Sequence, residues 1–103
     1  MYKHIVFWKL KGNSKSRKDL CHQVKLKLDS LPNKIPEIIE YETAINIGNY
    51  DASFFDISLI SSFKDEVDFW KYTKYPEHDE VVNFIKSIQD TEQIVDYETN
   101  VKI

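Results

Sequence analysis

The amino-acid sequence predicts an α+β domain in which a four-stranded antiparallel sheet carries helices on one face. Four segments alternate between apolar and polar residues with a period of two, as strands do. Between them lie segments whose apolar residues recur every three or four positions, as in helices. The length of 103 residues suits one core and is too short for two, so residues 1–103 are expected to form a single domain.

The first strand is expected over residues 2–10, with apolar side chains on both of its faces. One face holds Tyr2, His4, Val6, Trp8 and Leu10, and the other holds Lys3, Ile5, Phe7 and Lys9. A helix is expected after Gly12 and Asn13, with Ser14 or Ser16 as its cap. Its apolar residues recur at spacings of four, four and three, and are Leu20, Val24, Leu28 and Leu31. Pro32 ends this helix.

The second and third strands are expected on either side of a turn rich in Gly, Asn, Asp and Ser. The second runs from about Ile38 to Ile47, and its apolar face holds Ile39, Tyr41, Thr43, Ile45 and Ile47. The third begins at Phe54. Because it has apolar residues on both faces, it is expected to be a central strand.

The C-terminal part of the chain is expected to add a second helical region and a fourth strand. Helical spacing resumes at Asp65, with Val67, Trp70 and Phe69 expected to point inward, and it breaks at Pro76, where a new helix starts. The apolar stripe of that helix is Val81, Phe84, Ile85 and Ile88, and the last strand holds Val95, Tyr97, Thr99, Val101 and Ile103. The resulting βαββαβ order is that of the split βαβ, ferredoxin-like arrangement.

The apolar residues on the second face of the sheet predict a partner. Two helices can cover only one face of a four-stranded sheet, yet the first and third strands are apolar on both. An uncovered face of this kind would be larger than the apolar patches that monomers usually expose. A second copy of the chain is the simplest cover, which predicts a homodimer formed through the open sheet face.

Composition excludes several classes of function. A net charge of −3 and a pI near 5.6 argue against nucleic acid as the main partner. No apolar run is long enough to span a membrane and no leader pattern is present, so no membrane partner and a cytoplasmic location are expected. Cys21 is the only cysteine, and His4, His22 and His78 show no metal-ligand spacing, so no metal is expected.

Several short motifs, in order along almost the whole chain, resemble those of one known family. They are Lys3-His4-Ile5-Val6, Leu31-Pro32-Asn33-Lys34-Ile35-Pro36, Tyr72 with Tyr75-Pro76-Glu77-His78, Val81-Val82-Asn83-Phe84-Ile85, and Val95-Asp96-Tyr97. Together they resemble the stress-responsive A/B-barrel domain, or Dabb. This resemblance implies a ferredoxin-like monomer that packs sheet to sheet with a partner as a dimeric α/β barrel.

The resemblance also implies a set of site residues. The family includes stress-associated proteins and a plant polyketide cyclase that closes a linear poly-β-ketone by aldol condensation, without a metal or an organic cofactor. His78 matches the histidine that acts there as general base, Tyr72 the tyrosine that binds and polarises the substrate, and His4 a pocket histidine. Ile57 and Tyr75 stand where the cyclase or other members carry histidine, and are expected to line the same pocket.

The position of His78 gives its own chemical argument. It lies two residues after Pro76, so it should occupy the first turn of a helix, where free backbone N–H groups disfavour an imidazolium. Glu77, Asp79 and Glu80 act in the opposite direction, and the sign of the net pKa shift stays open. A neutral imidazole is the form that a proton-accepting base requires.

Three functions follow as hypotheses. The first is a homodimer that binds a small apolar or polyketide-like molecule in a pocket near His78, with no cofactor. The second is a stress-related dimer with a structural role and no reaction. The third is a metal-free, cyclase-like enzyme in which His78 is the general base. Haem binding between Trp70 and His78 is a further, more distant alternative.

Overall fold

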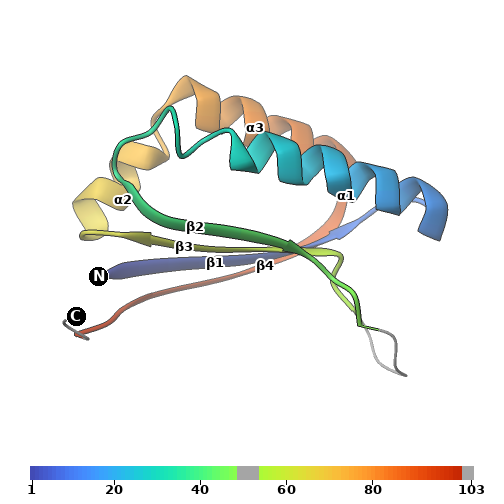
Figure 1. Cartoon of the computed structure of the whole chain (residues 1–103), viewed down its shortest axis with the longest axis horizontal. Coiled ribbons are helices and arrows are strands. Elements are labelled where there is room, and N and C mark those ends of the chain that lie inside the picture. The colour runs from blue at the N-terminus through green and yellow to red at the C-terminus, as the bar shows by residue number, and fades with distance from the viewer. Residues whose placement is uncertain (49–53, 101–103) are drawn as a thin grey trace.

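The computed structural model describes residues 1–48 and 54–100 and confirms the α+β class. The elements are β1 (Tyr2–Leu10), α1 (Ser14–Asp29), β2 (Ile38–Ile45), β3 (Ile57–Phe63), α2 (Glu66–Tyr72), α3 (Pro76–Ile88) and β4 (Gln89–Glu98). Both long helices lie on one face of the sheet, and within the described residues no helix lies on the other face (Figure 1).

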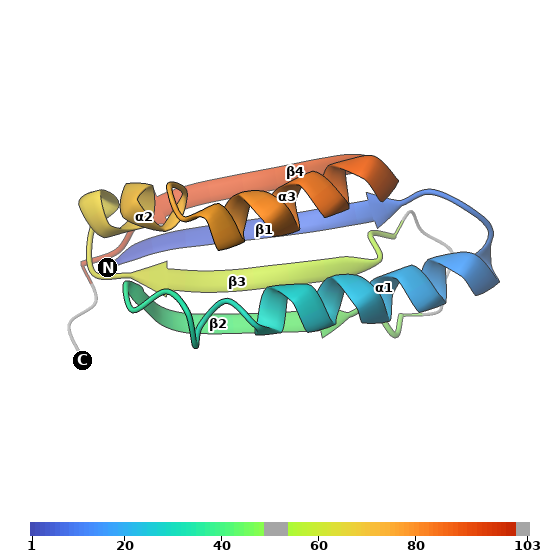
Figure 2. The ribbon, with the colours of Figure 1, turned by 90° about the horizontal axis from the view of Figure 1, so that it is seen from above.

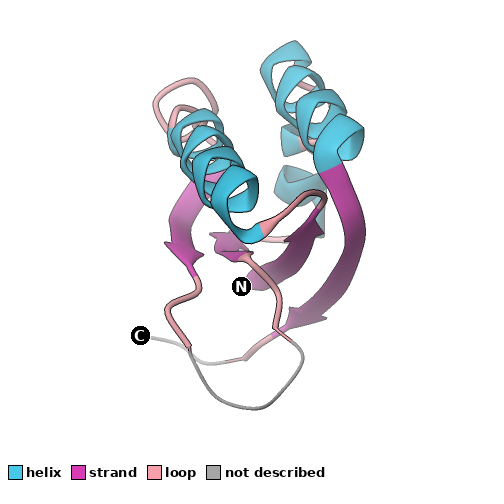
Figure 3. Ribbon diagram, turned by 90° about the vertical axis from the view of Figure 1, so that its right-hand side faces the viewer, coloured by secondary structure: helices cyan, strands magenta, loops and turns pink. Residues whose placement is uncertain are grey.

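The strands form one antiparallel sheet in the order β2-β3-β1-β4. The two strands with apolar residues on both faces, β1 and β3, are therefore the central ones, as predicted for β3. Seen from above, α1 lies over the β2 side of the sheet and α3 over the β1 and β4 side (Figure 2). The end view shows the two helices side by side as one layer above the curved sheet (Figure 3).

The core lies between the sheet and this helix layer. Its members are the helix-facing residues of the central strands and the apolar stripes of α1 and α3. They include Val6, Trp8, Leu10, Val24, Leu28, Leu31, Leu59, Phe63, Val81 and Ile85, all of them buried. Burying each large aliphatic or aromatic side chain stabilises the fold by about 1.5–3 kcal/mol. The predicted stripe of α3 is confirmed, since Phe84 and Ile88 pack against the same core.

The orientation expected for α2 was right for Phe69 and wrong for Val67 and Trp70. Val67 and Trp70 are 62% and 51% exposed, whereas Phe69 and Tyr72 are buried. Residues three apart lie on the same face of a helix, and in this helix of seven residues the pair that faces the sheet is Phe69 and Tyr72. The indole N–H of Trp70 donates instead to Glu66 Oε2 at 3.1 Å on the outer surface.

Three further expectations, two about β2 and one about α1, were corrected. Ile38 pairs with Phe63 and Glu40 with Ser62, so Ile39 is an extra residue that bulges out of the strand and is 55% exposed. β2 also ends at Ile45, which leaves Ile47 95% exposed. The cap of α1 is Asn13, rather than Ser14 or Ser16, because its Oδ1 accepts from the backbone N–H of Ser16 at 3.0 Å.

The ends of β3 and β4 also differ from the prediction. β3 begins at Ile57, three residues after Phe54, and β4 begins at Gln89, directly after the last residue of α3. The expected strand residues Val101 and Ile103 lie outside the described residues.

β4 contains one extra residue opposite the end of β1. Leu10 pairs with Gln89 and Lys9 with Thr91, so Asp90 has no partner of its own in the register. In a regular strand, residues three positions apart lie on opposite faces of the sheet, but one extra residue between them puts both on the same face. Gln89 and Glu92 therefore both face the helix layer.

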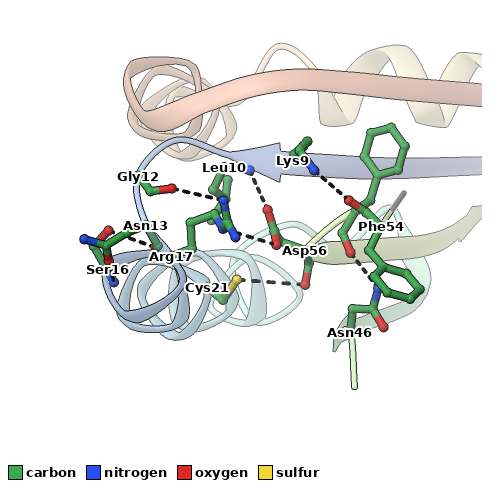
Figure 4. A network of polar contacts seen from close by, with 11 residues as sticks. Lys9, Leu10, Gly12, Asn13, Ser16, Arg17, Cys21, Asn46, Phe54 and Asp56 are labelled. Atoms are coloured by element: carbon green, nitrogen blue, oxygen red, sulfur yellow. Dashed lines mark hydrogen bonds and ion pairs between the residues drawn. The ribbon is translucent and has the colours of Figure 1, made fainter. Parts of the chain in front are cut away.

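A polar network ties α1 to the sheet at the end where β3 begins (Figure 4). Asp56 Oδ2 accepts from the backbone N–H of Leu10 at 2.8 Å, and Asp56 Oδ1 lies 3.9 Å from Arg17 Nε. Lys9 Nζ donates to the carbonyl of Phe54 at 3.1 Å. Cys21 nearby is a buried member of the core, and burial raises the pKa of its thiol.

Candidate functional site in the cavity beneath α3

A cavity of about 220 Å³ lies between α3 and the β1 and β4 side of the sheet. Three of its lining residues, His4, Tyr72 and His78, were predicted from the sequence to share a pocket. The others are Val6, Trp8, Leu28, Leu31, Leu59, Phe69, Thr73, Val81, Val82, Ile85, Lys86, Gln89, Glu92 and Ile94. The lining is mainly apolar with a few polar groups, which is the composition of small-molecule sites.

His78 enters the cavity from the first turn of α3, whose first residue is Pro76. Its ring meets the ring of Tyr72 edge-on, with centroids 4.5 Å apart. Burial lowers the pKa of His78 from its usual 6.5, and the carboxylate of Asp79, 3.7 Å from Nδ1, offsets only part of this effect. The imidazole is therefore neutral at pH 7, which settles the sign that the sequence left open.

Tyr72 is held by a second buried tyrosine. Its hydroxyl lies 2.8 Å from that of Tyr41, which comes from β2. Burial raises the pKa of Tyr72 to about 12, so the hydroxyl keeps its proton at neutral pH. Either hydroxyl of this pair can donate, and when Tyr41 donates, the hydrogen of Tyr72 is free for another acceptor.

His4 is fixed by a carboxylate on the neighbouring strand. Its Nδ1 lies 2.6 Å from Asp96 Oδ1, and the hydroxyl of Tyr2 donates to Asp96 Oδ2 at 2.7 Å. Burial and this hydrogen bond raise the pKa of Tyr2, so its hydroxyl remains a donor. The ring of His4 also packs against Phe69, with centroids 4.8 Å apart. Three groups thus set the position of one imidazole at the cavity wall.

Two buried side-chain atoms in the described ranges, 1–48 and 54–100, lack a hydrogen-bond partner, and both belong to residues that line this cavity. They are Nδ1 of His78 and Oε1 of Gln89. A buried polar group without a partner costs about 1–3 kcal/mol. Such groups mark a place where a ligand or water completes the hydrogen bonds.

Ile57 and Tyr75 do not line this cavity. Ile57 is buried near the start of β3, where it pairs with Trp8 and Ile45, well away from α2. Tyr75 is the capping residue of α3, and its hydroxyl donates to Glu37 Oε1 at 2.7 Å. That bond draws the ring toward the segment before β2, so a shared pocket role is not supported by their placement.

The sequence argument missed several polar residues at or beside the cavity, among them Tyr41, Gln89 and Asp96. Asp96 was the most accessible to prediction, because His4 and Asp96 face each other in the register of β1 and β4. Antiparallel pairing of the two terminal strands would have suggested that contact. Gln89 carried no such signal, since its direction depends on the extra residue in β4.

In the described part of the chain, no three His, Cys, Asp or Glu side chains gather in a way that could hold a metal ion. None of the helices described is both long and apolar enough to cross a membrane.

The fold and the cavity define a class of small ferredoxin-like proteins with a partly apolar pocket between sheet and helices. The model of the stress responsive A/B barrel domain, Dabb, matches residues 2–99, and the chain therefore belongs to this family.

Solved structures support the same fold. A dimeric ferredoxin-like protein of unknown function from Bacteroides fragilis is 27% identical, with 95% of each chain covered and a TM-score of 0.85. A dimeric ferredoxin-like protein from Thermobifida fusca is 20% identical over 95% of this chain and 90% of its own, with a TM-score of 0.79. A hydroxynitrile lyase from Passiflora edulis is 23% identical over 99% and 95%, with a TM-score of 0.79. Comparison with curated proteins gives no match.

Proposed function

We propose that residues 1–103 form a single-domain, cytoplasmic, homodimeric protein that binds a small, mainly apolar molecule in the cavity beneath α3. One observation carries the ligand: the unpartnered atoms His78 Nδ1 and Gln89 Oε1 both belong to lining residues of this cavity. A ligand that hydrogen-bonds to both would remove a cost of about 1–3 kcal/mol per atom.

The size of the cavity limits the ligand. A volume of 220 Å³ lies below the roughly 300–1,000 Å³ of sites for drug-sized molecules. A single aromatic ring with short substituents suits this space. Because Gln89 Oε1 accepts and the Tyr72 hydroxyl can donate when Tyr41 is the donor of their shared bond, the ligand should carry both a donor and a carbonyl-type acceptor.

The homodimer is supported by the open face of the sheet. Ile5 on β1 pairs with Ile60 on β3 and with Val95 on β4, so one apolar row crosses three strands. Phe7 and Tyr97 extend this row, and the exposed fractions of Phe7, Ile60, Val95 and Tyr97 are 40–55%. These five residues are called the open-face cluster below. Dimerisation of similarly folded proteins supports a second copy as its cover.

Binding of 4-hydroxyacetophenone, followed by NMR chemical-shift perturbation and calorimetry, tests the ligand proposal. This probe carries a phenol donor and a ketone acceptor on one ring, while acetophenone and 4-ethylphenol each lack one of the two groups. We expect the probe to bind more tightly than either analogue and to shift resonances of cavity residues. His78→Ala should weaken binding about tenfold, as the loss of one hydrogen bond does.

His22→Ala is the matched control, because His22 is an exposed histidine on α1 that does not line this cavity. It should leave the affinity unchanged. If none of the three compounds perturbs cavity resonances, or if both histidine variants behave alike, the ligand-binding proposal is wrong, and a dimer with a purely structural role becomes the better account.

A further inference from the structure

The cavity beneath α3 has polar groups at two separate ends. His78 and Tyr72 lie at the end near α2, with their rings in contact, and Gln89 lies at the other end, where α3 passes into β4. His78 is in the first turn of α3 and Gln89 is its capping residue. At about 1.5 Å of rise per residue, their Cα atoms are roughly 16 Å apart. The ligand group that bonds to Gln89 is therefore not the group that bonds to His78.

The second end, called the β4 end below, is formed by Gln89, Glu92 and Lys86. Gln89 pairs with Leu10 and Glu92 with Trp8, and both partners are buried beneath the helices, so Gln89 and Glu92 face the same layer. Gln89 Oε1 is buried without a hydrogen-bond partner. Within the described residues, the carboxylate of Glu92 takes part in no ion pair. Both groups accept hydrogen bonds, so the β4 end lacks a donor.

Lys86 does not supply that donor. It is the only lysine or arginine in the described lining, and it is an exposed residue in the last turn of α3. The stem of a lysine can cover an apolar wall while its ammonium group stays in water. Lys86 forms no ion pair with Glu92 in the described part of the chain. The donor that completes the β4 end therefore has to come from the ligand.

We propose that the β4 end is a second polar subsite, that it binds a protonated primary amine, and that the ligand of the cavity is an arylalkylamine. The inference rests on the ligand-binding function proposed above and names the class of ligand. The ammonium group donates to Gln89 Oε1 and to the Glu92 carboxylate. An ammonium group has three hydrogens and pairs with a carboxylate, so it satisfies both acceptors at once.

The other end of the cavity suits the aromatic part of such a ligand. Its lining includes the rings of His4, Phe69, Tyr72 and His78. Aromatic rings pack favourably against one another edge-on or offset. A phenol oxygen on the ligand ring can accept from the Tyr72 hydroxyl, while the alkyl chain carries the amine along the apolar wall toward Gln89.

Three phenols that differ at the end of one short alkyl chain test this subsite. Tyramine ends in an ammonium group, 4-ethylphenol lacks that group, and 3-(4-hydroxyphenyl)propanoate ends in a carboxylate. Calorimetry measures their affinities, and NMR chemical-shift perturbation locates them. We expect tyramine to bind at least tenfold more tightly than 4-ethylphenol and to shift the backbone resonances of Gln89 and Glu92. The propanoate should bind more weakly than 4-ethylphenol, because its charge faces that of Glu92.

Variants of the β4 end separate the contact from the general charge of the protein. Glu92→Gln removes the charge at nearly constant size, and should weaken tyramine binding about tenfold while leaving the affinity for 4-ethylphenol unchanged. Gln89→Met should also weaken tyramine more than 4-ethylphenol. Asp90→Asn is the matched control, because Asp90 is an exposed acid of β4 that does not line the cavity. It should change neither affinity. The ¹H–¹⁵N spectrum of each variant checks that the fold is retained.

Three results would overturn the amine subsite. Equal affinities for tyramine and 4-ethylphenol would do so, and if 4-hydroxyacetophenone still binds, the function proposed above stands without it. Tighter binding of the propanoate that is lost in Lys86→Met would assign the β4 end to an anion. Equal losses in Glu92→Gln and Asp90→Asn would mean that net charge, and not contact with Glu92, attracts the amine. If no phenol and no ketone binds, the proposed function fails, and the subsite fails with it.

Discussion

Individual side chains determine the chemistry of the cavity, because their hydrogen bonds decide which polar atoms of the lining residues remain unpaired. The hydroxyls of Tyr41 and Tyr72 share one hydrogen bond in which either can donate, so one of their two hydroxyl hydrogens is left for another acceptor. Asp96 fixes the hydrogen of His4 on Nδ1, which frees Nε2. In both cases a residue behind the cavity wall decides which atom faces a ligand. The chemistry therefore depends on hydrogen-bond partners as much as on the lining residues.

Because burial lowers the pKa of His78, the stability of the protein should depend on pH through this residue. The unfolded chain takes up a proton near pH 6.5, while folded His78 takes it up only at lower pH. Its contribution is therefore complete above pH 6.5 and is lost as the pH falls toward the folded pKa.

Chemical denaturation of the unmodified chain and of His78→Gln between pH 5 and 8 measures this contribution. The unfolding free energy of the unmodified chain minus that of His78→Gln should be constant above about pH 6.5. Below that pH this difference should decrease, by at most about 1.4 kcal/mol per pH unit. His22→Gln, at an exposed site, should show no such trend. A difference that grows in favour of the unmodified chain at low pH would contradict the assigned direction.

At the scale of elements, the polar network around Asp56 joins β1, the start of β3 and α1 (Figure 4). Asp56→Ala should lower the unfolding free energy by about 1–3 kcal/mol, because the backbone N–H of Leu10 then has no acceptor. Asp56→Asn keeps an oxygen and should cost less. Thermal and urea unfolding measure both.

Asp19→Ala serves as the control for this pair, since Asp19 is an exposed acid on α1. It should change stability by less than about 0.5 kcal/mol. Equal losses in Asp19→Ala and Asp56→Ala would mean that net charge, and not the bond to Leu10, accounts for the effect.

The sequence was sufficient for the elements and their order, because apolar periodicity survives in every strand and in both long helices. Prediction from the sequence failed where one extra or missing residue decides toward which side of the sheet or helix a side chain points. Ile39 turns outward at a bulge in β2, and α2 is too short for its periodicity to separate Phe69 from Trp70. In the site, His4, Tyr72 and His78 came together as the resemblance implied, whereas Gln89 depends on an irregularity that no local pattern announces.

The whole molecule consists of a sheet and a layer of helices that covers one face of the sheet. The proposed dimer follows from the other face, which the helices leave uncovered. Dimer formation should depend on the open-face cluster. Ile60→Lys places a charge in the middle of a central strand, opposite Ile5, and should convert the dimer to a folded monomer at micromolar concentration. Sedimentation velocity measures the mass, and circular dichroism checks that the fold is retained.

Leu26→Lys is the matched change outside the open face, because Leu26 on α1 is 73% exposed on the helix layer. This variant should remain a dimer. A monomer for the unmodified chain at the same concentration would contradict the proposed assembly, and a dimer for both variants would move the interface to another surface.

The extra residue in β4 determines which residues on either side of it face the cavity. Helix α3 passes into β4 without a connecting loop, and Asp90 is the one residue of β4 that has no partner in its register with β1. In a chain lacking Asp90, Gln89 and Thr91 would be adjacent and would still pair with Leu10 and Lys9, so the ladder would become regular and Gln89 would keep its face. A deletion further along the strand, of Gln93 for example, would instead make the following residues exchange faces, sending Asp96 to the outside and Val95 toward the cavity. Deletion of Asp90 should therefore be tolerated far better than deletion of Gln93, even though both residues are exposed.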